Sequence, residues 1–173
     1  MNDRSAAPGG LALVEALVNT LDLESGADAL DTAEGRARLG LPETTGDEVA
    51  DELARARELR ESLRAALLAH AGHPPHREVT PLDGLLASAP LLVTVDEHDG
   101  SARLTPADGA SLLSRTAAAV ADALIAGTWS RLKACESATC HWAYYDRSPA
   151  GRGRWCSMQV CGARAKMRRY RAK

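Results

Sequence analysis

Four cysteines constrain this chain more than any other feature. They are the only cysteines in its 173 residues, and Cys135, Cys140, Cys156 and Cys161 follow the spacing C-x4-C-x15-C-x4-C. Cysteine pairs at such spacing are typical of zinc knuckles and fingers. Four thiolates at tetrahedral corners leave no open position on Zn²⁺, so we expect one structural zinc ion. Disulfides or free buried thiols are the alternatives, and a reducing cytosol disfavours disulfides.

The residues between the cysteines predict a small hairpin. Cys135 and Cys140 enclose the turn sequence ESAT, and residues 142–145 (WAYY) have the composition of a strand. Residues 146–153 are rich in Ser, Pro and Gly, which favours a loop that reverses the chain.

The last part of the chain predicts a helix that carries two of the cysteines. Ser157 is placed to cap a helix that runs to about Tyr170, with Cys156 at its start and Cys161 in its first turns. A knuckle, a hairpin and a ligand-bearing helix form a treble-clef-like zinc finger. So short a module builds little core, so metal binding would supply much of its folding free energy.

The preceding residues have the pattern of a helical domain. Aromatic residues make up 3% of the chain and Phe is absent, so Leu, Ala and Val must fill the core, which favours helices. Apolar residues at helical spacing predict helices over residues 10–23, 47–70 and 106–126, and a shorter one between Asp31, as its cap, and Gly40.

Two further local patterns belong to this first part. Thr45 and Glu48 have the spacing of a capping box at the start of the long helix. Residues 91–95 and 101–105 flank the turn DEHDG and predict one β-hairpin. The predicted fold class is therefore mostly α, with one small β-hairpin and a treble-clef-like zinc finger.

Charge divides the chain where the composition changes. Residues 131–173 carry eleven Lys/Arg and two Asp/Glu, a net of +9, whereas residues 1–130 carry a net of −11. We therefore predict two domains, a helical one over residues 1–130 and a zinc finger over residues 131–173.

The basic residues of the zinc finger point to a polyanion as partner. Arg164, Arg168 and Arg171 share one face of the predicted helix. Contacts with phosphates would supply affinity, and a helix fits the major groove of DNA. The predicted nucleic-acid-binding residues are Arg152, Arg154, Arg164, Lys166, Arg168, Arg169 and Arg171.

Other partners remain open for the same basic surface. It could dock on an acidic protein or on the acidic domain of its own chain, or it could be a solvated tail. RNA is an alternative if Trp142, Tyr144, Tyr145 and Trp155 stack on bases, although these aromatic residues also suit a small core around the zinc ion.

The residues from Arg131 to Lys173 resemble the CGNR zinc-finger module of bacteria. The motif from which that family takes its name is here Cys161-Gly162-Ala163-Arg164, with Ala163 where the family usually has Asn. Contacts that the Asn side chain makes in the family therefore do not carry over to this chain. The surrounding RWCS and RAKxRRxR patterns are kept.

The first part of the chain is similar to the ABATE domain that accompanies this module, in the string ALVNTLD, in LRESLRAAL and in the hairpin before the last helix. The resemblance implies a stress-linked transcription regulator, whose first domain senses a signal such as a small molecule and whose zinc module binds DNA. Asn19 and Thr20 match an Asn-Thr signature of the family, which makes them candidate ligand-binding residues. The alternative is that Asn19 binds the backbone locally.

The sequence also excludes some functions. No run of apolar residues is long enough for a membrane span, so we expect a cytoplasmic protein. No phosphate-binding loop, nucleophile elbow or paired-carboxylate motif is present, and we expect no enzyme. His70, His73 and His76 are expected to be surface histidines. A homodimer is plausible because many regulators bind two half-sites.

Overall fold

The computed structural model describes residues 6–42 and 46–172 of the chain. The α-helices are α1 (Leu11–Val18), α2 (Ala33–Ala37), α3 (Asp47–His70), α4 (Leu82–Leu86), α5 (Leu112–Ile125) and α6 (Ala163–Arg171). Three further short helices are the 3-10 helices η1 (Ala29–Asp31) and η2 (Trp129–Arg131) and the π-helical turn η3 (Met158–Gly162). Among the described residues, no helix is long and apolar enough to cross a membrane.

The strands form two separate antiparallel pairs. They are β1 (Leu91–Val95) with β2 (Ala102–Pro106), and β3 (Leu132–Ala134) with β4 (Ala143–Tyr145). The predicted mostly helical fold with one hairpin and a zinc finger is thereby confirmed.

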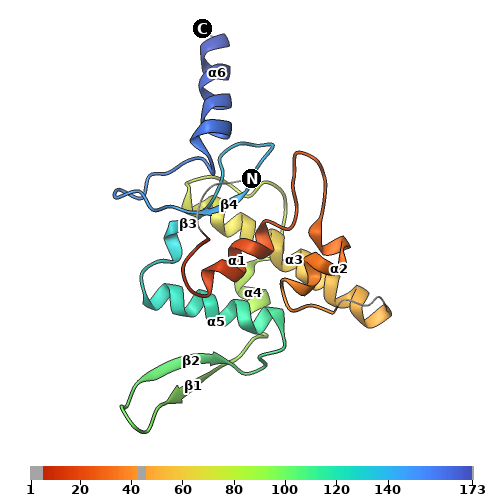
Figure 1. The fold of residues 1–173 in the computed structure, drawn as a ribbon, viewed down its shortest axis with the longest axis vertical. Coiled ribbons are helices and arrows are strands. Elements are labelled where there is room, and N and C mark those ends of the chain that lie inside the picture. The colour runs from red at the N-terminus through yellow and green to blue at the C-terminus, as the bar shows by residue number, and fades with distance from the viewer. Residues whose placement is uncertain (1–5, 43–45, 173) are drawn as a thin grey trace.

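The core lies among α1, α3 and α5, at the centre of the molecule in Figure 1. Val14, Leu17 and Leu63 are completely buried there, and Leu and Ala supply most of its other members. The β1–β2 hairpin projects from one end of the molecule, and α6 projects from the opposite end, with the C-terminus at its tip (Figure 1).

The same core continues into the zinc-finger region. Leu132, Ala134 and Ala143 of β3 and β4 are buried in one cluster with the side chains of α1 and α3. Tyr145 packs against this cluster from its edge. The β3–β4 hairpin therefore packs on the helical part. The prediction of two domains, 1–130 and 131–173, stays a prediction.

Some helix ends differ from those that the sequence predicts. The first helix ends at Val18 and not at residue 23, because Asp22 forms a turn in which its side chain accepts hydrogen bonds from the backbone N–H groups of Glu24 and Ser25. Such side chains compete with helical hydrogen bonds. Thr32, rather than Asp31, caps α2 by accepting from the N–H of Gly35.

The last helix of the first part begins later than predicted. Pro106 still pairs with Leu91 in the hairpin, and the side chain of Asp108 then accepts hydrogen bonds from the N–H groups of Ala110 and Ser111 in a turn. Ser111 caps α5, so the helix begins at Leu112. Helix α3 spans the predicted residues 47–70. The capping box that starts it cannot be placed, because Thr45 lies outside the described residues.

Candidate metal centre and nucleic-acid interface

The four cysteines come together in one cluster. Their sulfur atoms all lie within 4.8 Å of one another, and Cys135, Cys156 and Cys161 are buried. The sulfur of Cys156 lies 3.6 Å from that of Cys140 and 3.7 Å from that of Cys161. Zinc–sulfur bonds of about 2.3 Å in a tetrahedron place the sulfurs about 3.8 Å apart, so this donor set fits Zn²⁺.

The first cysteine pair sits on the turn between β3 and β4. The N–H of Cys135 donates to the carbonyl of Trp142 at 3.0 Å, and the N–H of Cys140 donates to the carbonyl of Ser137 at 2.8 Å. His141 adopts a left-handed backbone, with φ of 46°, and its Nδ1 lies 2.9 Å from the carbonyl oxygen of Cys135. His141 therefore braces the turn.

The second pair brackets the start of the last helix. Cys156 precedes the capping residue Ser157, whose side chain accepts from the N–H of Val160 at 3.3 Å, and Cys161 lies in η3. A Cβ atom on Gly162 would approach the sulfur of Met158 to 3.0 Å and the ring of Trp155 to 3.2 Å. The glycine of the C-G motif therefore allows this tight turn beside the metal centre.

The closeness of the four thiols shifts their pKa values in opposite directions. Hydrogen bonds from the thiols of Cys140 and Cys156 lower the pKa of Cys135 far below its ordinary value. The same interactions raise the pKa values of Cys140 and Cys156, and burial raises that of Cys161. One thiolate forms readily and its charge holds back the others, and a divalent cation removes that repulsion. The centre is a structural site for one zinc ion.

A buried ion pair builds the loop that follows β4. Asp146 is 2% exposed, and its carboxylate lies 3.1 Å from Nζ of Lys133. It also accepts from the N–H groups of Ser148 and Gly153 at 3.0 and 2.7 Å. Burial works to raise the pKa of Asp146, but these donors hold it well below its ordinary value. Asp146 thus holds the loop that carries Arg152 in place.

The aromatic residues pack around the metal centre. Tyr144 is buried and donates its hydroxyl to the carbonyl of Gly153 at 2.7 Å. Trp142 and Trp155 are partly buried against the cysteine cluster, and Tyr145 packs on the helical core. These rings therefore form the small core that the sequence offers as the alternative to base stacking.

The predicted nucleic-acid-binding residues fall into two groups. Lys166, Arg168, Arg169 and Arg171 are exposed on α6, and within the described part of the chain none of them forms an ion pair. Arg152 is exposed on the loop after β4.

Arg154 and Arg164 already have acidic partners. Nε of Arg154 lies 2.9 and 2.7 Å from the two carboxylate oxygens of Glu136. Nη1 of Arg164 lies 2.9 and 2.8 Å from those of Glu24, in the loop after α1. The first contact lies within the zinc finger, whereas the second joins α6 to the helical part.

Asn19 and Thr20 have partners within the protein. The side chain of Asn19 donates to the carbonyl of Ala143 at 3.0 Å and accepts from the N–H of the same residue at 2.7 Å. The Thr20 hydroxyl donates to the carbonyl of Leu17 and accepts from Arg60. Asn19 thus bridges 124 residues of chain, in place of the predicted local contact. Ligand binding at this pair stays a prediction.

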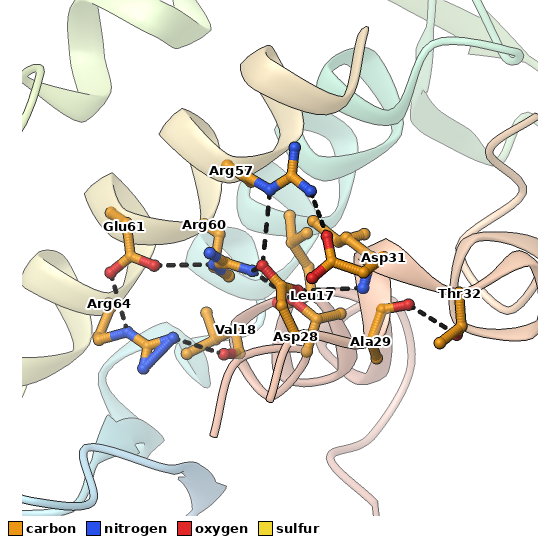
Figure 2. A network of polar contacts seen from close by, with 12 residues as sticks. Leu17, Val18, Asp28, Ala29, Asp31, Thr32, Arg57, Arg60, Glu61 and Arg64 are labelled. Carbon is orange, nitrogen blue, oxygen red and sulfur yellow. Dashed lines mark hydrogen bonds and ion pairs between the residues drawn. The ribbon is translucent and has the colours of Figure 1, made fainter. Parts of the chain in front are cut away.

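A buried polar network behind Thr20 has no obvious signal in the sequence. Arg60, Glu61 and Arg64 of α3 are at most 4% exposed. Figure 2 shows Arg64 reaching the backbone carbonyl of Val18 and Arg60 reaching the carboxylate of Asp28, with Glu61 paired to both arginines. Burial works to raise the pKa of Glu61, yet the two arginines keep it below its ordinary value. This network fixes the loop after α1 against α3.

The three histidines are partly buried and make specific contacts, so the prediction of surface histidines is only partly right. His70 contacts the carbonyl of Leu132 at 2.8 Å, and His73 contacts Glu136 at 2.7 Å. His76 contacts Glu61 at 3.0 Å, and its ring lies 5.7 Å from that of His141. Two of them therefore connect the end of α3 with the zinc finger, a role that their spacing of three residues in a Pro-rich segment does not indicate.

A separate cavity of about 640 Å³ lies in the helical part, away from Asn19 and Thr20. Apolar side chains of α3, α4 and α5 form much of its wall, and polar side chains come from α3 and from the turns after α4 and before α5. Its lining includes Ala56, Leu59, Leu85, Leu113, Glu52 and Ser88.

Comparisons with known proteins place both parts of the chain. The model of the ABATE family, described as "Putative stress-induced transcription regulator", matches residues 11–127, and the model of the CGNR zinc finger matches residues 131–173. Comparison with curated proteins gives no match. Both resemblances seen in the sequence are confirmed, and the chain belongs to the ABATE family and carries a CGNR zinc finger.

Proposed function

We propose that this protein is a zinc-dependent DNA-binding transcription regulator. The observation that carries the proposal is the position of α6, a basic helix that projects from the body and begins at a zinc ligand (Figure 1). Because Cys161 lies in η3, metal binding fixes the first turn of the helix. The zinc ion would therefore orient the basic residues, and its loss would release them.

The charge and size of this helix fit duplex DNA. Four basic side chains on α6 are exposed and without an acidic partner among the described residues. With η3 it has a length of about 20 Å, which is comparable with a helix that enters the major groove. Arg152, exposed on the loop that Asp146 holds in place, would add a further phosphate contact.

Salt dependence of duplex binding tests the proposal. With about five phosphate contacts, the logarithm of the association constant should fall with the logarithm of salt concentration at a slope near −4 to −5. Fluorescence anisotropy with labelled duplexes measures it. No binding at about 50 mM salt, or a binding curve indifferent to salt, contradicts the proposal.

One variant and one metal-removal experiment connect binding to the residues named here. Replacing Arg164, Arg168 and Arg169 together by Ala should abolish duplex binding, while one zinc ion per chain remains. Removal of zinc by a chelator should abolish it as well, because the helix start is then released. Binding that survives chelation would separate the basic helix from the metal centre and contradict the zinc-dependent part of the proposal.

The cavity in the helical part supports a second, regulatory function, the binding of a small effector. Its volume of about 640 Å³ lies within the range of small-molecule sites, and its mixed lining suits an amphipathic molecule. Thermal-shift screening of amphipathic metabolites against the wild type and a Ser88→Trp variant tests this. A true effector stabilises only the wild type, and compounds that stabilise both proteins equally contradict this site.

A docking function for the basic module has one specific observation in its favour, the contact of Arg164 with Glu24. In this alternative α6 would bind an acidic protein. Competition of duplex DNA with an acidic peptide for the labelled protein distinguishes the two, and RNA of the same sequence serves as a third competitor. In either case we propose a binding protein of the cytoplasm and no catalytic role, and a homodimer stays a prediction.

A further inference from the structure

The projecting helix carries an exposed apolar stripe that the basic residues alone do not explain. Val160, Ala163, Met167 and Tyr170 are spaced by three and four residues, so they share one face. Val160, Met167 and Tyr170 are 49, 52 and 77% exposed. A stripe of this kind normally covers a core, yet α6 packs chiefly against its own first turn, η3.

Basic residues flank this stripe on both sides. Arg164, Arg168 and Arg171 lie along one edge, and Lys166 and Arg169 lie beyond the other. A shallow, open depression lies along the first edge, lined by Val160, Ala163 and Met167 together with the three arginines and Gln159. An apolar centre with a cationic border on each side matches a groove whose two rims are phosphate chains.

From this arrangement we infer that the stripe reads A·T base pairs in the major groove, an inference that rests on the proposed DNA-binding function. An A·T pair presents the adenine N6 and N7 atoms there, to which an amide side chain binds in bidentate fashion, and it presents the thymine methyl group. Gln159 supplies the amide, and Val160, Ala163 and Met167 supply apolar contact for the methyl group.

Charge argues against a second copy of α6 on this face, and groove shape argues against double-stranded RNA. A second copy of α6 would bring the same cationic borders together, and their repulsion would oppose a helix pair. Double-stranded RNA has a major groove that side chains cannot enter, and its uracil bases lack the methyl group. A duplex of DNA satisfies both the cationic borders and the apolar centre.

Duplexes that differ in one groove at a time test the inference. We would compare alternating duplexes of about 20 base pairs made of dA·dT, dA·dU, dI·dC and dG·dC by fluorescence anisotropy. The dA·dU duplex lacks only the methyl group. The dI·dC duplex has the major groove of dG·dC and a minor groove like that of dA·dT.

The expected order is dA·dT first, dA·dU weaker by about threefold or more, and dI·dC weaker by about tenfold and similar to dG·dC. Met167→Ala should reduce the difference between dA·dT and dA·dU, and Gln159→Ala should reduce the preference over dI·dC. Arg168→Ala is the matched control on the same helix, and it should weaken binding to all four duplexes by a similar factor.

The outcomes separate this inference from the proposed function. Equal affinity for dA·dT and dA·dU, or tight binding to dI·dC, overturns the major-groove inference and leaves DNA binding in place. Absence of binding to every duplex at about 50 mM salt overturns both. Tighter binding to double-stranded RNA than to dA·dT also overturns the inference.

Discussion

At the scale of single residues, Asp146 is the group on which the loop of the zinc finger depends. It is the only described acidic residue after Glu136, and it is buried with Lys133. Asp146→Ala leaves the Lys133 ammonium buried without its counter-charge, and we expect a loss of about 3–5 kcal/mol in the free energy of unfolding. Urea unfolding of the zinc-loaded protein measures it.

A double-mutant cycle shows whether the loss comes from this ion pair. Adding Lys133→Met to Asp146→Ala should recover part of the stability, because the unpaired charge is then removed as well. Losses that simply add would mean that Asp146 acts only through the backbone N–H groups of Ser148 and Gly153. The sequence marks Asp146 as the last acidic residue of the chain, but its burial follows from packing that no local pattern encodes.

At the scale of secondary-structure elements, the packing of β4 against α1 depends on the side chain of Asn19. Asn19 completes both hydrogen bonds of Ala143, a residue that is 1% exposed. Asn19→Ala should cost about 1–3 kcal/mol in the free energy of unfolding, because the N–H and carbonyl of Ala143 lose their partners. Gln159→Ala removes an exposed amide elsewhere, and we expect almost no change in stability from it. Comparable losses in the two variants would contradict the bridge.

The elements that the sequence predicts best are those with strong local signals. Helix α3 has a long apolar repeat, β1 has five strand-forming residues, and the cysteine spacing alone identifies the metal centre. Helix α4 is missed because its five residues make little more than one turn and no side chain caps it, and strand β3 is missed because its three residues, LKA, carry no strand pattern. Strand β3 pairs with β4, and β3 packs on α3 whereas β4 packs on α1, so only the tertiary structure reveals β3.

At the scale of the whole molecule, the end of α3 and the zinc finger share a half-buried histidine contact that should make stability depend on pH. Burial lowers the pKa of His70 despite its hydrogen bond with Leu132. The unfolded chain takes up a proton near pH 6.5, whereas the folded chain resists it, so stability is complete above that pH and falls below it. We expect less than about 1 kcal/mol from this group between pH 7 and 5.5.

Variants of two histidines test this dependence. His70→Gln should flatten the curve of unfolding free energy against pH, and His98→Gln, in the exposed turn of the first hairpin, serves as the control variant. Zinc content has to be followed in parallel, because protons also compete for the thiolates. Equal slopes for the wild type and His70→Gln would contradict the assignment.

The contact between Glu24 and Arg164 couples the helical part to the projecting helix. Glu24 lies in the loop that the Arg60–Asp28 ion pair fixes against α3, so a shift of that loop would change the pairing of Arg164. Glu24→Gln should free Arg164 for a phosphate and raise the affinity for duplex DNA by about two- to fivefold at low salt. The gain should shrink as salt rises, because the ion pair is exposed and screened.

Glu34→Gln provides the matched control for this coupling. It removes the same charge from a more exposed ion pair, with Arg38, and that pair lies within α2 and its cap. If both variants raise affinity alike, the effect is one of net charge, since any lost carboxylate favours a polyanion. If only Glu24→Gln does so, the acidic loop competes with DNA for Arg164, and a ligand that displaces the loop would change DNA affinity through this contact.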